Sequence, residues 1–135
     1  MRKYLSVLHS EAKSIKSDAL IMAHTPNPYL ADVLDMIRLN DINIWPNKDI
    51  NRAMRHRAKV AGVACPEAII DTDNWPVIDR KSWREYLEIQ AELGVPSLYA
   101  VTHIDSTQEP LEAEDYELIR QVWARYRAQH ATPGG

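Results

Sequence analysis

The chain has 135 residues, of which 45% are hydrophobic and 26% are charged, and its formal net charge is −3. These values predict one folded domain over residues 1–130 with a disordered tail at 131–135. No apolar run reaches the roughly 18 residues of a membrane span, and an acidic chain has no overall field for nucleic acid, so we expect neither partner. The single Cys65 excludes an internal disulfide and a metal site with several cysteines. The N-terminus lacks a signal-peptide pattern, which is compatible with a cytoplasmic location.

The first third of the chain predicts a helix, a strand and a short helical segment. Residues 2–16 carry an apolar stripe at helical spacing: Leu5, Leu8, Ala12 and Ile15. The continuous apolar run 19–23 is typical of a parallel strand buried on both faces. It ends in the polar and proline-rich segment 24–28, because proline cannot donate to a strand ladder. Residues 29–34 can form one or two helical turns.

Residues 35–41 are ambiguous, since they can continue a helix from Tyr29 or form a short strand that ends in polar residues. The strand is the preferred interpretation. A helix then begins at Asn47 or Asp49, and Gly62 near its end is typical of a helix C-terminus.

The second half repeats the strand–helix alternation. Residues 67–70 predict a third strand, and a helix follows that Asp79 can cap, or Ser82 with Glu85 as a capping box. Gly94 ends this helix, and residues 96–101 predict a fourth strand.

The last helix covers residues 111–130, since Pro110 stands where helices commonly begin. Alternating strands and helices predict a parallel sheet with right-handed crossovers. The expected fold class is therefore α/β.

Each of the four predicted strands is followed by a polar cluster. The clusters are His24, Thr25 and Asn27; Arg38, Asn40 and Asp41; Asp71, Asp73 and Asn74; and His103 and Asp105. Because the carboxyl ends of parallel strands form the binding face of such folds, we expect these side chains to share one rim. The alternative is that each cluster is an ordinary turn, where Asp and Asn are common.

Carboxylates beside Trp45 and Trp75 indicate a carbohydrate site. One carboxylic acid can protonate a glycosidic oxygen while another carboxylate attacks or activates water. Indole rings stack on the apolar face of a sugar, although both can equally be hydrophobic plugs beside prolines.

Other chemistries fit the pattern less well. The acidic residues of the third and fourth clusters match no calcium loop, and the chain has no HExxH or CxxC motif, so we expect no metal. No glycine-rich loop follows a strand, which argues against a phosphate site and, with the missing metal motifs, leads us to expect no cofactor. The basic run 52–59 is interpreted as the solvated face of a helix, and Cys65 as a buried structural thiol.

Over roughly residues 2–127 the chain resembles the second half of the (βα)8 barrel of α-galactosidase (melibiase-like) glycoside hydrolases. The segment 36–42, Met-Ile-Arg-Leu-Asn-Asp-Ile, is similar to that family's sixth strand, where an Arg shortly precedes the acid/base Asp. The segment 71–75, Asp-Thr-Asp-Asn-Trp, is similar to the exit of the seventh strand. Residues 83–99, with a Gly-x-Pro joint, resemble the helix and strand that follow. The Arg-to-Asp spacing is one residue shorter here than is usual in the family.

The resemblance implies a parallel (βα)4 half-barrel, strands five to eight of a TIM barrel, that binds a glycoside or oligosaccharide. Asp41 would then be the acid/base of a retaining enzyme. The substrate-binding residues would be His24, Asn27, Arg38, Asp71, Asp73, Asn74, Trp75, His103 and Asp105. The family's nucleophile, in a Lys-x-Asp motif, has no counterpart before residue 18. We therefore expect the chain to be inactive alone and to need a second copy or an N-terminal half-barrel.

Two other functions fit the same residues. One is a flavodoxin-like or half-barrel binding module that has no catalytic activity. The other is a regulatory or interaction protein that binds its partner through the helix at 111–130.

Overall fold

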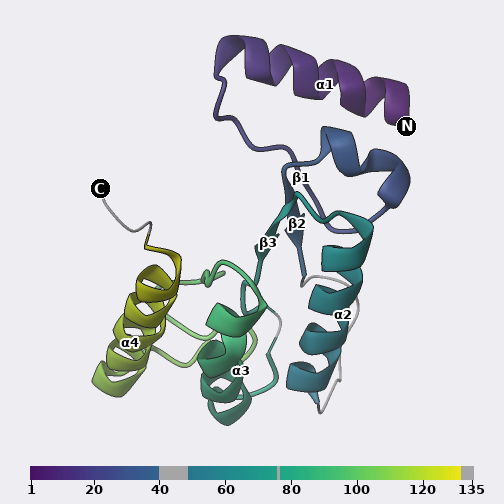
Figure 1. Cartoon of the computed structure of the whole chain (residues 1–135). Helices are drawn as coiled ribbons and strands as arrows, with labels where there is room; N and C mark the ends of the chain where they lie inside the picture. Colours follow the sequence, from purple (N-terminus) through teal and green to yellow (C-terminus); the bar gives the residue numbers. More distant parts are fainter. Residues whose placement is uncertain (40–48, 76, 132–135) are drawn as a thin grey trace.

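The computed structural model describes residues 1–39, 49–75 and 77–131 (Figure 1). In chain order the elements are α1 (Arg2–Ile15), β1 (Met22–Ala23), the 3-10 helix η1 (Pro28–Val33), β2 (Met36–Arg38), α2 (Ile50–Ala64), β3 (Ile69–Asp71), α3 (Arg80–Leu93) and α4 (Ala113–His130). No helix in these ranges is long and apolar enough to span a bilayer.

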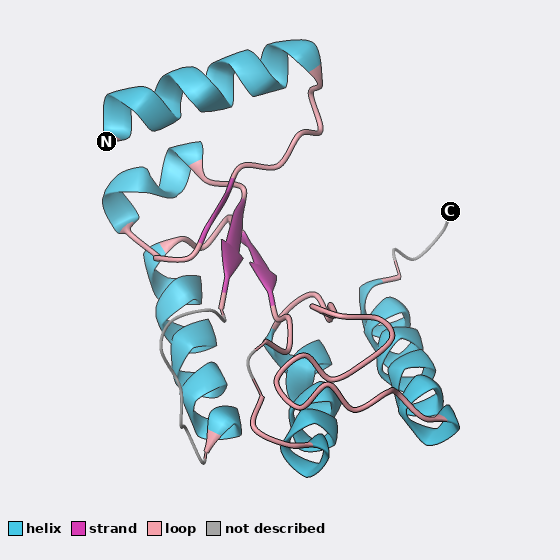
Figure 2. Ribbon diagram, turned by 180° about the vertical axis from the view of Figure 1, so that it is seen from behind, coloured by secondary structure: helices cyan, strands magenta, loops and turns pink. Residues whose placement is uncertain are grey.

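The described strands form a parallel sheet in the order β1-β2-β3. This confirms the α/β class and the strand interpretation at the start of segment 35–41. Asn40 and Asp41, the rest of that segment, lie outside the described residues. The strands are two or three residues long and point away from α1 (Figure 2).

The two faces of the sheet differ in their cover. Ala23, Ile37 and Ile70 are paired across the three strands, and this row packs into the core beneath the helices. Alternation places the next row, Met22, Met36 and Ile69, on the opposite face. Met22 is 51% exposed and Ile69 39% exposed. The expectation that the first strand is buried on both faces is therefore wrong.

The predicted fourth strand at 96–101 is not a strand in the structure. Pairing beside β3 is limited to Val95, whose N–H donates to the Ile70 carbonyl at 2.7 Å and whose carbonyl accepts from Thr72. Pro96 follows directly and has no N–H to continue the ladder. The described residues thus form a three-stranded open sheet rather than a four-stranded half-barrel.

Aspartate side chains cap the N-termini of α2 and α3 at residues that the sequence predicted as helix starts. Asp49 accepts from the Arg52 N–H at 3.0 Å, and Asp79 accepts from the Ser82 N–H at 2.7 Å. Asp79 rather than Ser82 is therefore the cap. Gly94 ends α3 as predicted, but Gly62 lies inside α2, which continues to Ala64.

The first helix lies apart from the others, near η1 at one end of the molecule (Figure 1). Its contacts are polar: Lys13 pairs with Asp35 at 2.7 Å, and Arg2 pairs with Asp32 at 2.6 Å. The predicted apolar stripe is not a buried face, because Leu8 and Ile15 are exposed and no residue of α1 is buried. Leu5 and Ala12 are partly buried beside the paired residues Arg2 and Lys13, so one edge of the stripe lies toward the protein and the other edge lies outward.

Candidate functional site

The loop that follows β3 is buried, and side chains of α3 hydrogen-bond to its backbone. The Thr72 carbonyl accepts hydrogen bonds from the Tyr86 hydroxyl at 2.9 Å and from the Gln90 side-chain amide. Thr72, Asp73 and Asn74 are all buried. Burial raises the pKa of the Tyr86 phenol, and the nearby carboxylates of Asp73 and Asp71 raise it further. Tyr86 is therefore a fixed donor that holds the loop in one shape.

Arg38 and Asp73 form an ion pair at the carboxyl ends of β2 and β3. The Arg38 Nε donates to the Asp73 carboxylate, and both side chains are largely buried. The other oxygen of Asp73 accepts from the Trp75 N–H at 3.0 Å, which fixes the turn. Arg38 is the last residue of β2, where it also lines a cavity beside α2, so the ion pair lies at the covered carboxyl end of the sheet.

Two aromatic rings stand beside this ion pair. The ring centroids of Trp75 and Tyr99 are 5.4 Å apart, and the Arg38 guanidinium lies 5.7 Å from the centroid of Tyr99. Asn74 fixes the Tyr99 backbone, since its Oδ1 accepts from the Tyr99 N–H at 3.0 Å. We call Arg38, Asp73, Asn74, Trp75 and Tyr99 the rim cluster.

The rim cluster contains one unsatisfied polar atom. Asn74 Nδ2 is buried and has no hydrogen-bond partner, and the orientation of the amide is set by the bond to Tyr99. A buried donor without an acceptor is costly, so this atom favours a water or another oxygen arriving beside it. The other carboxylate of the segment, Asp71, accepts from the Ser97 hydroxyl.

The remaining predicted site residues lie in other surroundings. His24 lines a cavity with Arg38 beside α2, whereas Asn27 caps η1 by accepting from the Tyr29 N–H at 3.0 Å. His103 forms an isolated antiparallel β-bridge with Pro110, and its ring Nδ1 lies 3.0 Å from the Thr102 hydroxyl. The Asp105 backbone carbonyl accepts a hydrogen bond from the Gln108 side-chain amide in a turn. Asp41 and Trp45 lie outside the described residues.

The arrangement is suited to recognition more than to metal binding. Within residues 1–39, 49–75 and 77–131, no group of three His, Cys, Asp or Glu side chains is placed to hold a metal ion. The ion pair offers donors and acceptors at fixed positions, and the two rings offer an apolar surface beside it. This combination can bind a polyhydroxylated molecule.

The basic run and the cysteine have structural contacts. Arg55 pairs with Glu92 on α3 at 2.7 Å, and Arg57 donates to the Leu39 carbonyl at 2.9 Å. Cys65 is buried, as predicted, and its sulfur lies 3.7 Å from the Asn27 carbonyl.

Three residues that shape the site were not predicted from the sequence. Tyr99 and Ser97 fall in the segment expected to be a strand, and Gln90 was not singled out. Their roles depend on contacts between residues far apart in the sequence, such as the hydrogen bond from the Tyr99 N–H to Asn74, so no local pattern pointed to them.

Comparison with known proteins gives no relative for this chain. No family model, no curated protein and no solved structure matches it.

Proposed function

We propose that this chain binds a glycoside and forms part of a retaining, α-galactosidase-like glycoside hydrolase that cleaves O-glycosidic bonds. The observation that supports the proposal is the rim cluster. It combines a buried Arg–carboxylate pair with two aromatic rings at the carboxyl ends of parallel strands, the location of the active site in α/β barrels. The polar side chains and the resemblance of segments 36–42 and 71–75 point to the same substrate class.

Within this proposal the rim cluster positions the sugar rather than transferring protons. Asp73 already accepts from Arg38 and from the Trp75 N–H, so it is suited to holding hydroxyl groups. Trp75 and Tyr99 stack on the apolar face of the ring. Asp41 is the acid/base, and His24, which lines a cavity with Arg38, supports the bound sugar.

A retaining mechanism needs a second carboxylate about 5–5.5 Å from the acid/base. The resemblance places that nucleophile on a strand with no counterpart in this chain. The open sheet with Met22 and Ile69 exposed is consistent with a face that a second copy or another half-barrel covers. We therefore expect the isolated chain to give no turnover with an aryl α-galactoside.

The test is a titration of the full chain with galactose. The NMR signals of the tryptophan indole N–H groups report binding. We expect the Trp75 indole to shift, and the shift to be lost in Asp73→Asn and Trp75→Leu. Tyr29→Ser is the matched control, because Tyr29 is exposed on η1 away from the rim cluster, and it should leave the response unchanged.

Two outcomes would count against the proposal. If galactose moves no indole signal at tens of millimolar, the rim cluster does not bind this sugar class. If the isolated chain hydrolyses an aryl α-galactoside and Asp41→Asn removes that activity, the acid/base is supported but the expected inactivity is wrong.

A further inference from the structure

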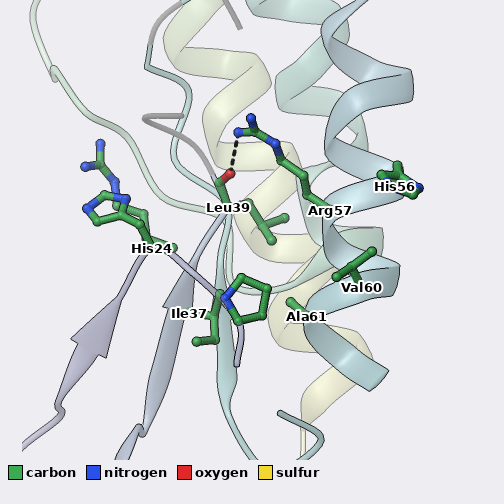
Figure 3. Close-up of a pocket in the computed structure, with 9 residues that line it drawn as sticks. His24, Ile37, Leu39, His56, Arg57, Val60 and Ala61 are labelled. Carbon is green, nitrogen blue, oxygen red and sulfur yellow. Dashed lines mark hydrogen bonds between the residues drawn. The ribbon is translucent and has the colours of Figure 1, made fainter. Parts of the chain in front are cut away.

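The rim cluster borders a small cavity between the sheet and α2 (Figure 3). Arg38 lines this cavity, and its wall includes the almost fully buried Ile37, Leu39 and Ala61. The cavity volume is about 190 Å³, whereas an apolar cavity of about 150 Å³ is already suited to a benzene ring. A sugar ring with its hydroxyl groups is larger than benzene, so a chain of two sugar rings cannot continue into this cavity.

The rim cluster is followed along the chain by exposed apolar side chains. Val101 comes two residues after Tyr99, and both side chains are exposed. Two residues of backbone span at most about 7 Å, which is comparable to the length of one sugar unit. Tyr116, in the first turn of α4, reaches the same segment, because its hydroxyl donates to the Val101 carbonyl at 3.1 Å. We call Val101 and Tyr116 the ledge.

The contacts of these residues fix the aromatic rings and leave apolar surface exposed. The Tyr116 hydroxyl donates its hydrogen to the Val101 carbonyl, and the side chain remains partly exposed. Asn74 holds the Tyr99 backbone, and the Tyr99 ring packs beside Trp75. A ring that is already fixed loses little conformational entropy when a ligand binds, so the ledge is a preorganised platform.

We propose that the ledge binds the second sugar ring of an oligosaccharide whose first ring occupies the rim cluster. This inference rests on the proposed function and adds the chain length of the ligand and the direction in which it extends. The apolar face of a sugar ring stacks on the Tyr116 ring, and the exposed methyl groups of Val101 contact the same face. Because the cavity beside α2 is too small for a second ring, the longer chain extends over the ledge.

The test compares two probes on the full chain by NMR: methyl α-galactoside, which has one sugar ring, and melibiose, which has two. The Trp75 indole signal gives the affinity for each probe, and the Val101 methyl signals report contact with the ledge. Melibiose should bind about fivefold more tightly, which is the gain expected from one additional ring stacked on an aromatic side chain. The Val101 methyl signals should shift with melibiose and stay unchanged with methyl α-galactoside.

Three variants sharpen this test. Tyr116→Ala should remove the gain of melibiose and leave the affinity for methyl α-galactoside unchanged. Tyr116→Phe should keep the gain, because it retains the ring and removes only the hydrogen bond to the Val101 carbonyl. Tyr4→Ala is the matched control, since Tyr4 is an exposed tyrosine of α1, which lies at the opposite end of the molecule from α4 (Figure 1).

Four results would overturn the inference while methyl α-galactoside still binds. These are equal affinity for the two probes, a gain that survives in Tyr116→Ala, a gain that is lost in Tyr116→Phe, and equal weakening of both probes by Tyr116→Ala. The last two results would mean that Tyr116 only holds the loop through its hydroxyl. A Trp75 signal that does not respond to methyl α-galactoside contradicts the proposed function itself, and the inference then fails with it.

Discussion

The helix α1 and the helix pair α3–α4 pack against the rest of the protein in different ways. Five residues of α3 are buried, among them Trp83, Tyr86 and Leu87, whereas α1 has none. The contacts of α1 are ion pairs at its surface, while α4 packs on α3 around a buried carboxylate. Because buried contacts set local stability, we expect α1 to open long before α3 and α4.

The largest effect should come from the carboxylate between α3 and α4. Asp115 is fully buried, and its oxygens accept from Arg80, from Arg84 at 2.6 Å and from the Glu112 N–H at 2.9 Å. Asp115→Asn removes the buried anion and leaves Arg80 and Arg84 only the more exposed Glu112 carboxylate, 3.6 Å from each, so the free energy of unfolding should fall by about 3 kcal/mol. Urea unfolding measures this. Glu117→Gln, on the exposed side of α4, should leave the midpoint unchanged.

The same carboxylate gives a pH dependence. Burial alone would raise the pKa of Asp115, but the Glu112 N–H and the guanidinium groups of Arg84 and Arg80 lower it overall. Its stabilising effect is therefore complete above the unfolded-state pKa of about 3.9 and is lost as the pH falls through the folded-state value. The stability gap between wild type and Asp115→Asn should be constant above about pH 5 and shrink below about pH 4. A gap that widens toward acid pH would contradict this assignment.

The end of α3 should be the next most sensitive position. A Cβ added at Gly94 would lie 2.3 Å from the Ile70 carbonyl oxygen, which is backbone of β3 and cannot move aside cheaply. Gly94→Ala should lower the free energy of unfolding by about 2 kcal/mol. Gly62→Ala is the matched control, because a Cβ there meets nothing within 4 Å inside α2, and it should stabilise by about 0.5 kcal/mol or more. Equal effects at both glycines would show that the contact with β3 is not what matters.

The helices could be predicted from the sequence because their signals are local. Asp49 and Asp79 as caps and Gly94 as the end of α3 each depend on hydrogen bonds within a few residues. The orientation of α1 could not be predicted this way. Its apolar stripe suggested a buried face, but Lys13 pairs with Asp35, twenty-two residues away in sequence, and Leu8 and Ile15 of the stripe remain exposed.

The sequence predicted which residue types form the candidate site, but it did not predict most of the contacts between them. Arg38 and Asp73 were expected on one rim because parallel strands bring their carboxyl ends together, and they do pair. The predicted fourth strand failed because only Val95 pairs beside β3 before Pro96 interrupts the ladder. Tyr99 therefore lies in a loop, where Asn74 holds it against Trp75, a contact between residues 25 positions apart that no local pattern encodes.

A smaller loss of stability is expected at Asp35, which connects α1 to the rest of the protein. Asp35 accepts from Lys13 and from the Ile21 N–H at 2.8 Å, and these bonds lower its pKa even though burial opposes the shift. Asp35→Asn should cost about 1 kcal/mol in global stability, since the carboxylate is only partly buried. The clearer readout is amide exchange, which should speed up in α1 and stay unchanged in α3. Asp18→Asn, whose carboxylate is exposed, is the control and should change neither.

The smallest effect should come from the outer surface of α1. Ile15 is 86% exposed, and isoleucine and serine have similar helix propensities, so Ile15→Ser should change the free energy of unfolding by less than about 0.5 kcal/mol. The same substitution at Ile119, which is buried on α4, should cost about 3 kcal/mol or more. Thermal melting and size-exclusion chromatography at two concentrations measure both. If Ile15→Ser is as damaging as Ile119→Ser, or lowers the apparent mass, then another molecule covers the outer face of α1 in solution. The contrast between the two regions would then describe the single chain and not its assembled form.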